Sequence, residues 1–538
     1  MKNLPLGVQN FREIIEKNHV YVDKTMYIHQ LITSGKCFFL SRPRRFGKSL
    51  FLDTIAEVFK GNRELFKGLW IYDSGYDFKP HPIIKLDMSN VTTLSTEAFV
   101  KSLTARLLCN AKEGNVDVYE ETPTGLLNDL IRGLQLKYNQ QIVVLIDEYD
   151  KPILDHVTDI KIAESNRNIV RDLYGLLKSL DSYIKFTFFT GVSKFTKTSV
   201  FSSLNNLSDI TMNKNYANVC GIPVNDLELY FGERIKILSQ HENFIESPSL
   251  TDLILKWYDG YSWDGKTRLL NPFGLLSFFY AEELKSFWYV SGSPKFLIDL
   301  IKENPYCVPS LGNIKMLERS LDAIDIGSLE ISALLFQTGY LTVSKVIPAI
   351  AETGTPTSYL LDIPNFEVRD AFFSQLLASF TENDYFFTDN AYFDMKEALR
   401  NGDLQTVLVK LKSLFASIPY QLHVEKEAYY HSIFFCLMNV LGFKIDAEVS
   451  VSRGRIDATL ELRDKVYVFE FKYENCPNDA DECTKRKIFE KTLEIGMKQI
   501  NERGYADKYA GCGKTVYLAA FAFLGRSDVE MRHTVIQA

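Results

Sequence analysis

Short runs rich in apolar residues alternate with amphipathic stretches over the first two hundred residues of the chain. Such runs are typical of strands that are buried in a parallel sheet, and they lie at 37–40, 83–86, 142–146 and 184–189. Two intervening stretches, 50–60 and 96–109, have the apolar spacing of amphipathic helices. This alternation predicts an α/β domain with a doubly wound parallel sheet, which we place at residues 1–224.

The pattern changes between residues 225 and 403, where the apolar spacing becomes helical. Asn271–Gly274 predicts a turn and a helix start, because proline suits the first helical position. Residues 334–341 predict a helix that ends at Gly339. The aromatic residues within 257–263 are compatible with a stacking platform for bases or with a core, and we favour the core. We interpret this region as a helical lid or adaptor domain.

A third pattern fills residues 404–538. A helix near 403–422 leads into it, and the following elements have the order α-β-β-β-α-β. The expected helices are at 424–441 and 484–503, and the expected strands are at 443–451, 455–462, 465–472 and 515–521. This order predicts a C-terminal α/β domain built around a central hairpin.

Composition narrows the class of protein. The formal net charge is −7, so binding of nucleic acid would need local basic groups such as Arg453, Arg455 and Lys487. The eight cysteines are scattered without a Cys-x-x-Cys pair, which argues against a zinc ribbon or a disulfide scaffold. No apolar run approaches 18 residues and the N-terminus lacks the apolar core of a signal peptide. We therefore expect a cytoplasmic protein without a membrane partner.

The first candidate site is the basic loop that follows the strand at 37–40. It closes on Gly47-Lys48-Ser49 and precedes an amphipathic stretch, which is the order of strand, phosphate-binding loop and helix. We assign nucleotide binding to the loop residues Arg44, Arg45, Phe46, Gly47, Lys48 and Ser49. Lys48 is expected at the β- and γ-phosphates, and the hydroxyl of Ser49 is a candidate Mg²⁺ ligand.

The usual phosphate-loop pattern begins with a glycine five residues before Gly47, and this chain has Arg42 there. A bare Gly-Lys-Ser is common in proteins, so the loop alone does not establish a nucleotide site. One hypothesis is that Arg42, Arg44 and Arg45 supply positive field to the phosphates in place of the missing glycine turn.

The second half of the predicted nucleotide site is the end of the strand at 142–146. Asp147 and Glu148 follow this strand, and open α/β sheets bind their ligands at the carboxyl ends of strands. Asp147 is expected to hold Mg²⁺ directly or through water, and Glu148 to orient or polarise the attacking water. The alternative is a strand that ends in two acids before a turn. Thr190 and Ser193, after the next strand, are candidates for sensing the γ-phosphate or for satisfying turn backbone.

The C-terminal hairpin carries a second group of acids. If Arg463-Asp464 is a two-residue turn, Leu462 pairs with Lys465, and Asp457 lies opposite Glu470. The other face then pairs Ile456 with Phe471, Ala458 with Phe469 and Leu460 with Tyr467.

Two facing carboxylates repel each other unless a cation lies between them, and a hard divalent metal ion with oxygen ligands is the natural candidate. Lys472 would orient or activate water for phosphodiester hydrolysis, so we assign Asp457 and Glu470 as metal ligands and all three as catalytic. Glu427, on one helical face with His431, would add a further acid. The alternative is a solvated strand face, and a slip of one residue would move Asp457 to the other face.

Taken together, these residues resemble a bacterial family of AAA-ATPase-like proteins with a C-terminal PD-(D/E)XK nuclease-superfamily domain. The resemblance rests on Tyr21–Thr25, Arg42–Ser49, Leu145–Asp150, Gly454–Asp457 and Glu470–Lys472, and covers nearly the whole chain. It implies an AAA-like P-loop domain at the N-terminus and a restriction-endonuclease-like α/β domain at the C-terminus. It also implies that the arginine at the first glycine position is a family feature, and that the hairpin residues Asp457, Glu470 and Lys472 match the nuclease motif.

Two details depart from the pattern of that nuclease superfamily. The proline that usually precedes the first motif aspartate is replaced by Ile456. Gln499 with Tyr505 is a loose match to the Gln-Tyr helix motif of some of its members.

We expect an ATP-binding and ATP-hydrolysing protein that controls a Mg²⁺-dependent, DNA-cleaving nuclease domain. The alternative is a nucleotide-switched binding or signalling module whose nuclease-like domain only docks nucleic acid or a partner protein. The expected cofactors are ATP and Mg²⁺, and DNA is the expected macromolecular partner. Formation of a homo-oligomer is left open.

Overall fold

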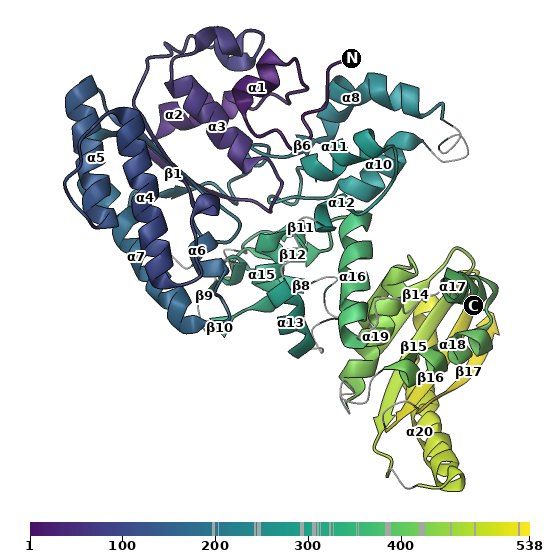
Figure 1. Cartoon of the computed structure of the whole chain (residues 1–538). Coiled ribbons are helices and arrows are strands. Elements are labelled where there is room, and N and C mark those ends of the chain that lie inside the picture. Colours follow the sequence, from purple (N-terminus) through teal and green to yellow (C-terminus); the bar gives the residue numbers. More distant parts are fainter. Residues whose placement is uncertain are drawn as a thin grey trace. The chain divides into compact units, whose positions relative to one another are not determined.

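The structure is a computed structural model, and it forms two compact units (Figure 1). Unit 1 comprises Met1–Gly292 and Lys315–Glu367, and unit 2 comprises Ser293–Ile314 and Val368–Ala538. The domain boundaries predicted from the sequence stay a prediction. The structure describes residues 1–195, 200–202, 204–241, 244, 249–290, 295–303, 308, 311, 314–321, 324–325, 328–350, 352, 354–381, 389–418, 426–451, 454–477, 480–525 and 528–537.

Unit 1 contains the predicted parallel sheet, with five strands in the order β2-β3-β4-β1-β5. All four predicted strands are present, and a short fifth strand joins them at the edge beside β1. The strands are β1 (Cys37–Ser41), β2 (Ile83–Asp87), β3 (Ile142–Asp147), β4 (Ile184–Gly191) and β5 (Ser208–Asp209). The interior strand β3 is buried along its whole length, as its continuous apolar run predicts.

Helices cover both faces of this sheet. The connection from β1 to β2 runs in the opposite direction along the sheet from the connections β2–β3 and β3–β4, so right-handed crossovers place α3 on the face opposite α4, α5 and α7. In Figure 1, α4, α5 and α7 pack side by side. The helices are α1 (Phe11–Glu16), α2 (Thr25–Ser34), α3 (Lys48–Phe59), α4 (Thr96–Gly114), α5 (Pro123–Tyr138), α6 (Lys151–Leu154) and α7 (Ile160–Ser179).

The rest of unit 1 is mostly helical, with short strands inserted. Asn271 caps α11 and Gly339 ends α15 with a φ of 93°, so both predicted helix boundaries are confirmed. The helices are α8 (Val224–Leu238), α10 (Leu250–Tyr258), α11 (Pro272–Ala281), α12 (Phe287–Val290), α14 (Glu318–Leu321) and α15 (Ile331–Thr338). The strands are β6 (Ile222–Pro223), β7 (Leu269–Leu270), β9 (Ile324–Asp325), β10 (Ser328–Leu329), β11 (Thr342–Ile347) and β12 (Ser358–Asp362), and β8 (Ile314–Leu317) joins β12.

Unit 2 contains a five-stranded mixed sheet in the order β13-β14-β15-β16-β17. Only β15 and β16 run parallel, and every other neighbouring pair is antiparallel. The strands are β13 (Ile445–Val451), β14 (Gly454–Glu461), β15 (Lys465–Glu474), β16 (Thr515–Leu524) and β17 (Asp528–Gln537). The predicted α-β-β-β-α-β order is therefore confirmed, with β17 as an additional strand after it.

Helices pack on the two faces of the second sheet. The α19 ring of Phe434 packs on Phe469 of β15 and on Phe521 of β16, whereas α20 packs on Val468 and Leu518 of the other face. Together these layers bury the central strands β15 and β16. The helices of unit 2 are α13 (Lys295–Glu303), α16 (from Val368 to Thr381), α17 (Asp389–Asn401), α18 (Leu404–Ser417), α19 (Glu427–Val440) and α20 (Glu482–Glu502).

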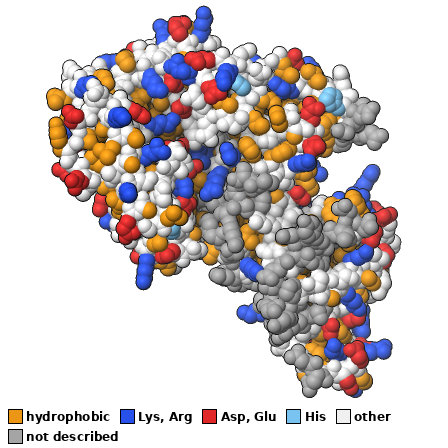
Figure 2. Space-filling model, in the orientation of Figure 1, with side chains coloured by type: hydrophobic (Ala, Val, Ile, Leu, Met, Phe, Trp, Pro, Cys, Tyr) orange, Lys and Arg blue, Asp and Glu red, His pale blue; other side chains and the backbone are white. Residues whose placement is uncertain are grey.

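Side chains of both charge signs are interspersed over the visible face of the molecule (Figure 2). This mixed surface fits the small formal net charge. Among the described helices, none combines the length and the apolar character that crossing a bilayer requires.

Candidate functional sites

The phosphate loop of unit 1 joins β1 to α3, as the sequence predicts. Gly47 precedes the first residue of α3 with a φ of 97°, which is a left-handed conformation that favours glycine. Arg45 also has a positive φ, of 61°. The loop thus turns sharply twice, and it delivers Lys48 and Ser49 to the N-terminus of a twelve-residue helix, where backbone N–H groups favour an anion.

Arg42 has a structural role instead of the predicted contribution to the phosphate field. Its guanidinium is buried, lies 3.9 Å from the ring centre of Trp263, and donates hydrogen bonds to carbonyl oxygens of Ser41, Thr211 and Tyr216. Burial lowers the pKa of Arg42 to about 10. The hypothesis of three phosphate-facing arginines is therefore wrong for Arg42, because its donors hold the loop to residues 211–216.

The Lys48 ammonium donates to the loop itself. It bonds to the carbonyl oxygens of Arg42 and Pro43, both at 2.9 Å. Burial lowers the pKa of Lys48, while the nearby carboxylates of Asp147 and Glu148 act in the opposite direction. A positive charge is thus held beside the loop and the end of β3, in the position where a phosphate chain would meet both.

A cavity of about 540 Å³ opens next to this loop. All six predicted loop residues line it, and all of them except Phe46 are polar, charged or glycine. Glu148, which follows β3, lines it as well. The lining also includes the N-terminal segment 5–9, apart from Leu6, and the α11 residues Pro272 and Phe273. Asp147, in contrast, is buried and does not line the cavity.

A second, apolar pocket of about 100 Å³ adjoins this cavity and shares Phe46, Gly47 and Leu50 with it. Its lining is largely apolar, but Lys24 contributes a buried ammonium group. Burial lowers the pKa of Lys24 to about 8, and this side chain forms no ion pair with any residue that the structure describes. The sequence pattern does not single out Lys24 as a site residue, although it lies within the Tyr21–Thr25 motif.

The acids at the end of β3 have different partners. Asp147 accepts hydrogen bonds from the Thr190 hydroxyl and, at 3.0 Å, from the backbone N–H of Glu148. Glu148 has a φ of 50°, and burial raises the pKa of its half-buried carboxyl group. Glu148 thus lines the cavity from a strained backbone position, whereas Asp147 does not line it.

Asp150 ties the end of β3 to the end of β4. Its carboxylate accepts from the backbone N–H and the hydroxyl of Ser193, both at 2.6 Å, and it is fully buried. Of the two candidate sensors, Thr190 therefore contacts Asp147 and Ser193 contacts Asp150. Both hydroxyls support acids at the strand ends.

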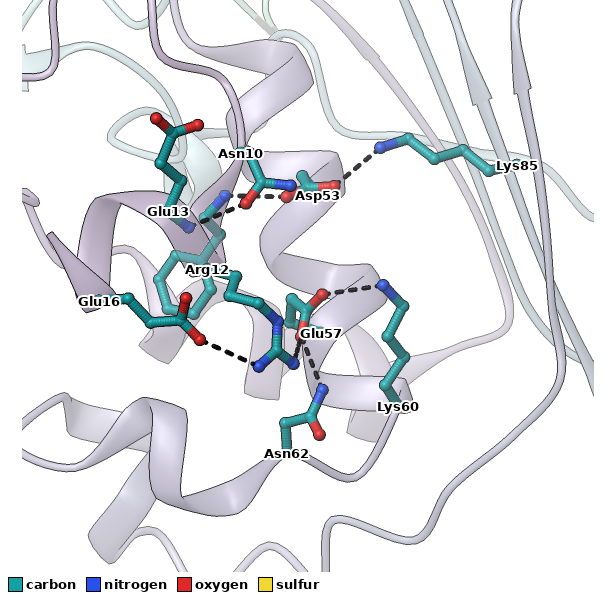
Figure 3. Close-up of polar contacts among 10 residues, drawn as sticks. Asn10, Arg12, Glu13, Glu16, Asp53, Glu57, Lys60, Asn62 and Lys85 are labelled. Carbon is teal, nitrogen blue, oxygen red and sulfur yellow. Dashed lines mark hydrogen bonds and ion pairs between the residues drawn. The ribbon is translucent and has the colours of Figure 1, made fainter.

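A polar network around the buried acids Asp53 and Glu57 connects α3 to α1 and β2 (Figure 3). Asp53 of α3 accepts from the backbone N–H of Phe11, at the start of α1, and from the ammonium of Lys85 on β2, both at 2.8 Å. One turn later, the buried Glu57 accepts from three donors, which belong to Arg12, Lys60 and Asn62. The helix that begins with Lys48 thus holds α1, and with it the segment that lines the cavity.

In unit 2, the register of the predicted hairpin is confirmed. The N–H of Leu462 donates to the carbonyl of Lys465, and Ala458 pairs with Phe469 as expected. Beyond this pair, the strands do not continue with the predicted backbone pairs of Asp457 with Glu470 and Ile456 with Phe471. Instead, the Asp457 carboxylate accepts a hydrogen bond of 2.8 Å from the backbone N–H of Phe471.

The side chain of Asp457 thus occupies the place of a ladder acceptor, and the alternation of faces shifts there. Ile456 packs with Val468 on the α20 side rather than beside Phe471, so that pairing in the prediction is wrong. The described ladder between β14 and β15 ends at Ala458, whereas β14 stays paired with β13 as far as Gly454.

Glu470 is the most enclosed acid of this site. Its side chain is 0% exposed, Oε1 accepts from the Lys472 ammonium at 2.8 Å, and Oε2 has no hydrogen-bond partner among the described residues. Burial and the nearby Asp457 raise the pKa of Glu470 to about 7. Lys472 also donates to the carbonyl of Phe471 at 2.8 Å, and the surrounding carboxylates raise its pKa above the ordinary value despite burial.

Helix α19 brings two more groups to this site. Burial raises the pKa of Glu427, whose charge also acts on Glu470 and Lys472. His431 is buried and stacked on Phe471, and burial lowers its pKa to about 4.

From the other face, the Tyr505 hydroxyl donates to the carbonyl of Arg455 and accepts from Gln499 at 3.3 Å and from Arg503 at 3.2 Å. Gln499 and Tyr505, which the sequence matched only loosely, therefore do meet. Arg503 was not predicted as a residue of this site, because no sequence motif relates it to the acids Asp457 and Glu470.

These residues fit a divalent metal ion in donor chemistry. Asp457 and Glu470 supply carboxylate oxygens. The buried Oε2 of Glu470 receives no hydrogen bond from the described residues, so it can serve as a metal ligand. In the described part of the chain, no three His, Cys, Asp or Glu side chains are already arranged as a metal-binding group. A metal ion would therefore take two protein carboxylates and complete its coordination with other oxygen atoms.

The two sites define a protein with a P-loop nucleotide-binding type of domain and a nuclease-like α/β domain in one chain. Residues 5–201 match a family described as a predicted AAA-ATPase, and residues 425–533 match the PD-(D/E)XK nuclease superfamily. An uncharacterized protein in the vnfD 5' region of Azotobacter chroococcum mcd 1 is 34% identical over 531 residues, which is 97% of this chain and 96% of the relative. The chain belongs to the family of AAA-ATPase-like proteins with a C-terminal PD-(D/E)XK nuclease-superfamily domain.

Proposed function

We propose that this protein binds and hydrolyses ATP in unit 1 and uses nucleotide binding to control a Mg²⁺-dependent DNA nuclease site in unit 2. The observation that carries the proposal is the buried Glu470 carboxylate, held between Asp457 and Lys472 in a domain of the nuclease superfamily. A buried acid with an unpartnered oxygen is costly for folding, and a cation bound there offsets that cost.

In unit 1, the loop backbone from Arg44 to Ser49 and the Lys48 ammonium would bind the phosphates. Ser49 and Asp147 would hold the Mg²⁺ ion of the nucleotide, Asp147 through water because it does not line the cavity. Glu148, which lines the cavity and whose pKa burial raises, would orient the attacking water. The adjoining apolar pocket suits a nucleobase, with the Lys24 ammonium as a donor to acceptor atoms on its edge.

In unit 2, Asp457 and Glu470 would hold the metal ion. When bound there, Mg²⁺ lowers the pKa of water and stabilises negative charge on the scissile phosphate. Lys472 would position the attacking water and stabilise the same charge, after exchanging its contact with Glu470 for one with the substrate. We further propose that the three functional regions follow the boundaries 1–224, 225–403 and 404–538, and that the protein acts in the cytoplasm.

The test measures ATP hydrolysis and DNA cleavage by the full chain, with single- and double-stranded DNA, with Mg²⁺ or Mn²⁺, and with or without ATP. The matched variants are Lys48→Ala for unit 1, and Asp457→Ala and Glu470→Ala for unit 2. Lys48→Ala is expected to abolish ATP turnover, and each acid variant is expected to abolish cleavage while ATP turnover remains.

A protein that cleaves no DNA under any of these conditions would refute the nuclease assignment. The alternative function would then follow if ATP-dependent binding of a partner or of DNA survives loss of both acids but not loss of Lys48.

A further inference from the structure

Three consecutive carbonyl groups of the phosphate loop are held by side chains. The Lys48 ammonium holds those of Arg42 and Pro43, each at 2.9 Å. The next carbonyl, that of Arg44, accepts a hydrogen bond of 2.8 Å from the indole N–H of Trp288. Because triphosphate oxygens compete for the Lys48 ammonium, nucleotide binding is expected to change the first two contacts. The third carbonyl belongs to the same short segment, so its contact with Trp288 is sensitive to that change.

Trp288 connects the loop to a second element. Its side chain is 1% exposed and packs edge-on against the ring of Tyr340, with centroids 5.5 Å apart. Its backbone N–H donates to the Glu367 carboxylate at 2.6 Å. Glu367 is fully buried in the first turn of α16 (Phe366–Thr381). One residue thus contacts the phosphate loop with its side chain and the start of α16 with its backbone.

The start of α16 also meets a second wall of the nucleotide cavity. Pro272 and Phe273, the first residues of α11, line that cavity. The following residue, Gly274, lies so close to Glu367 that an added Cβ would be 2.8 Å from the carboxylate. The first turn of α16 is therefore packed against elements that border the nucleotide cavity through two separate contacts.

From Val368 onward, α16 belongs to unit 2 and packs along α19 (Figure 1). Arg369 donates to the side-chain oxygen of Asn439 at 2.7 Å, and the ring of Phe373 packs on that of Phe435 with centroids 5.6 Å apart. A rotation or a shift of α16 would therefore act directly on α19.

Helix α19 carries groups of the candidate nuclease site at its other end. Glu427, its first residue, acts electrostatically on Glu470 and Lys472, and His431 stacks on Phe471 at 4.8 Å between ring centroids. Displacement of α19 would change the charge and the packing beside the acids. Contacts within unit 1 thus lead from the phosphate loop to the first turn of α16, and contacts within unit 2 lead from the rest of α16 to this site.

We propose that Trp288 couples the nucleotide state of the phosphate loop to helix α16, and through α16 to helix α19 beside the acidic site. This inference rests on the proposed function and adds the route by which ATP would act on the nuclease domain. It assigns to Trp288 a regulatory role, without contact to ATP or to the reacting atoms. In this proposal, the start of α16 has two arrangements, and the phosphate loop shifts the balance between them through Trp288.

The experiment measures hydrogen–deuterium exchange of the full chain with and without Mg²⁺ and ATP, in peptides that cover 366–381 and 427–440. ATP binding is measured separately by calorimetry. In the wild type, we expect ATP to change exchange in both peptides by about 2- to 10-fold, the range that corresponds to gain or loss of one hydrogen bond. Trp288→Phe keeps an aromatic ring and removes the indole donor. It is expected to bind ATP within about threefold of the wild type and to lose the change in both peptides.

The chain offers matched controls. Trp70→Phe makes the same chemical change at a half-exposed tryptophan that packs on His29, and it is expected to behave as the wild type. Glu367→Gln keeps an acceptor oxygen for the Trp288 N–H and is expected to retain coupling, whereas Glu367→Met is expected to lose it. The Glu367 pair carries the test if Trp288→Phe does not fold.

The outcomes separate the inference from the proposed function. The route is overturned, and the ATP site stands, if the wild type binds ATP but exchange in both peptides is unchanged. The same holds if ATP changes exchange in Trp288→Phe and Glu367→Met as much as in the wild type. If the wild type binds no ATP, the proposed function fails, and the route fails with it. The route is supported if ATP no longer changes exchange in Trp288→Phe and Glu367→Met but still does so in Trp70→Phe and Glu367→Gln.

Discussion

Glu367 allows a quantitative test of a buried acid in unit 1. Burial raises the pKa of its carboxyl group from an ordinary value of 4.5 to about 8, against the effect of the backbone N–H groups that it accepts from. One carboxylate oxygen accepts from Trp288, and the other has no hydrogen-bond partner among the described residues. The folded protein therefore keeps a proton on Glu367 that the unfolded chain releases above about pH 4.5.

The sign of the pH dependence follows from this difference. Because the folded state binds the extra proton, Glu367 makes folding progressively less favourable as the pH rises from about 4.5 to about 8, and the loss is constant above that. At about 1.4 kcal/mol per pH unit, the cost is about 1 kcal/mol at pH 5 and about 4 kcal/mol at pH 8. Glu367→Gln removes the titration, so its gain over the wild type should grow by about 3 kcal/mol between these values.

The assay is urea denaturation followed by tryptophan fluorescence, with the wild type and Glu367→Gln compared at pH 5, 6.5 and 8. All four tryptophans lie in unit 1, so this signal reports unfolding of that unit alone. The amide group introduced by glutamine carries a cost of its own, but that cost does not depend on pH. Glu121→Gln, at an exposed glutamate, serves as the control and should show no such slope. An advantage of Glu367→Gln that is equal at all three pH values would refute the argument.

Three further predictions concern the walls of the nucleotide cavity. Arg42→Met should lower the free energy of unfolding of unit 1 by about 2–4 kcal/mol in urea titrations, since three carbonyls and Trp263 lose their partner, whereas Arg44→Met should change it by less than about 0.5 kcal/mol. Asp53→Ala should cost about 1–2 kcal/mol in the same titrations because the α1 cap and the Lys85 pair are lost, and Asp53→Asn should cost less than half of that. Lys24→Met should weaken ATP binding about tenfold or more in calorimetry and leave binding of inorganic triphosphate unchanged, and equal weakening of both ligands would contradict a role at the base.

Elements that carry a local signal in their own residues could be predicted from the sequence. The continuous apolar run of β3 and the short turn at Arg463-Asp464 each carry a local signal, and both the strand and the hairpin register up to Ala458 are observed. Strand β17 was missed because its alternation of polar and apolar residues, which begins with Val529 and Met531, stops at three consecutive polar residues, and most of the strand is exposed. It forms by pairing along all of β16, which is a property of the partner strand and not of its own sequence.

Site features that depend on distant residues could not be predicted. Arg42 stacks on Trp263, and Trp288 reaches the carbonyl of Arg44 across a separation of 244 residues. Lys24 is a buried lysine, and the sequence of its segment does not distinguish it from an exposed one. In each case the tertiary neighbours decide what the side chain does, and no periodicity along the chain encodes those neighbours.

The two candidate sites share one arrangement of charge that bears on how they would be controlled. At each site the key lysine is held by oxygen atoms of its own site: Lys48 by carbonyls of the phosphate loop, and Lys472 by Glu470 and the carbonyl of Phe471. Either proposed ligand would therefore exchange an existing contact rather than simply add one. In the proposed function, a triphosphate would draw Lys48 off the loop by attraction, whereas a metal ion at Glu470 would displace Lys472 by repulsion. Because the loop carbonyls that Lys48 would release adjoin the one that Trp288 holds, the first exchange would have a physical means of influencing the second.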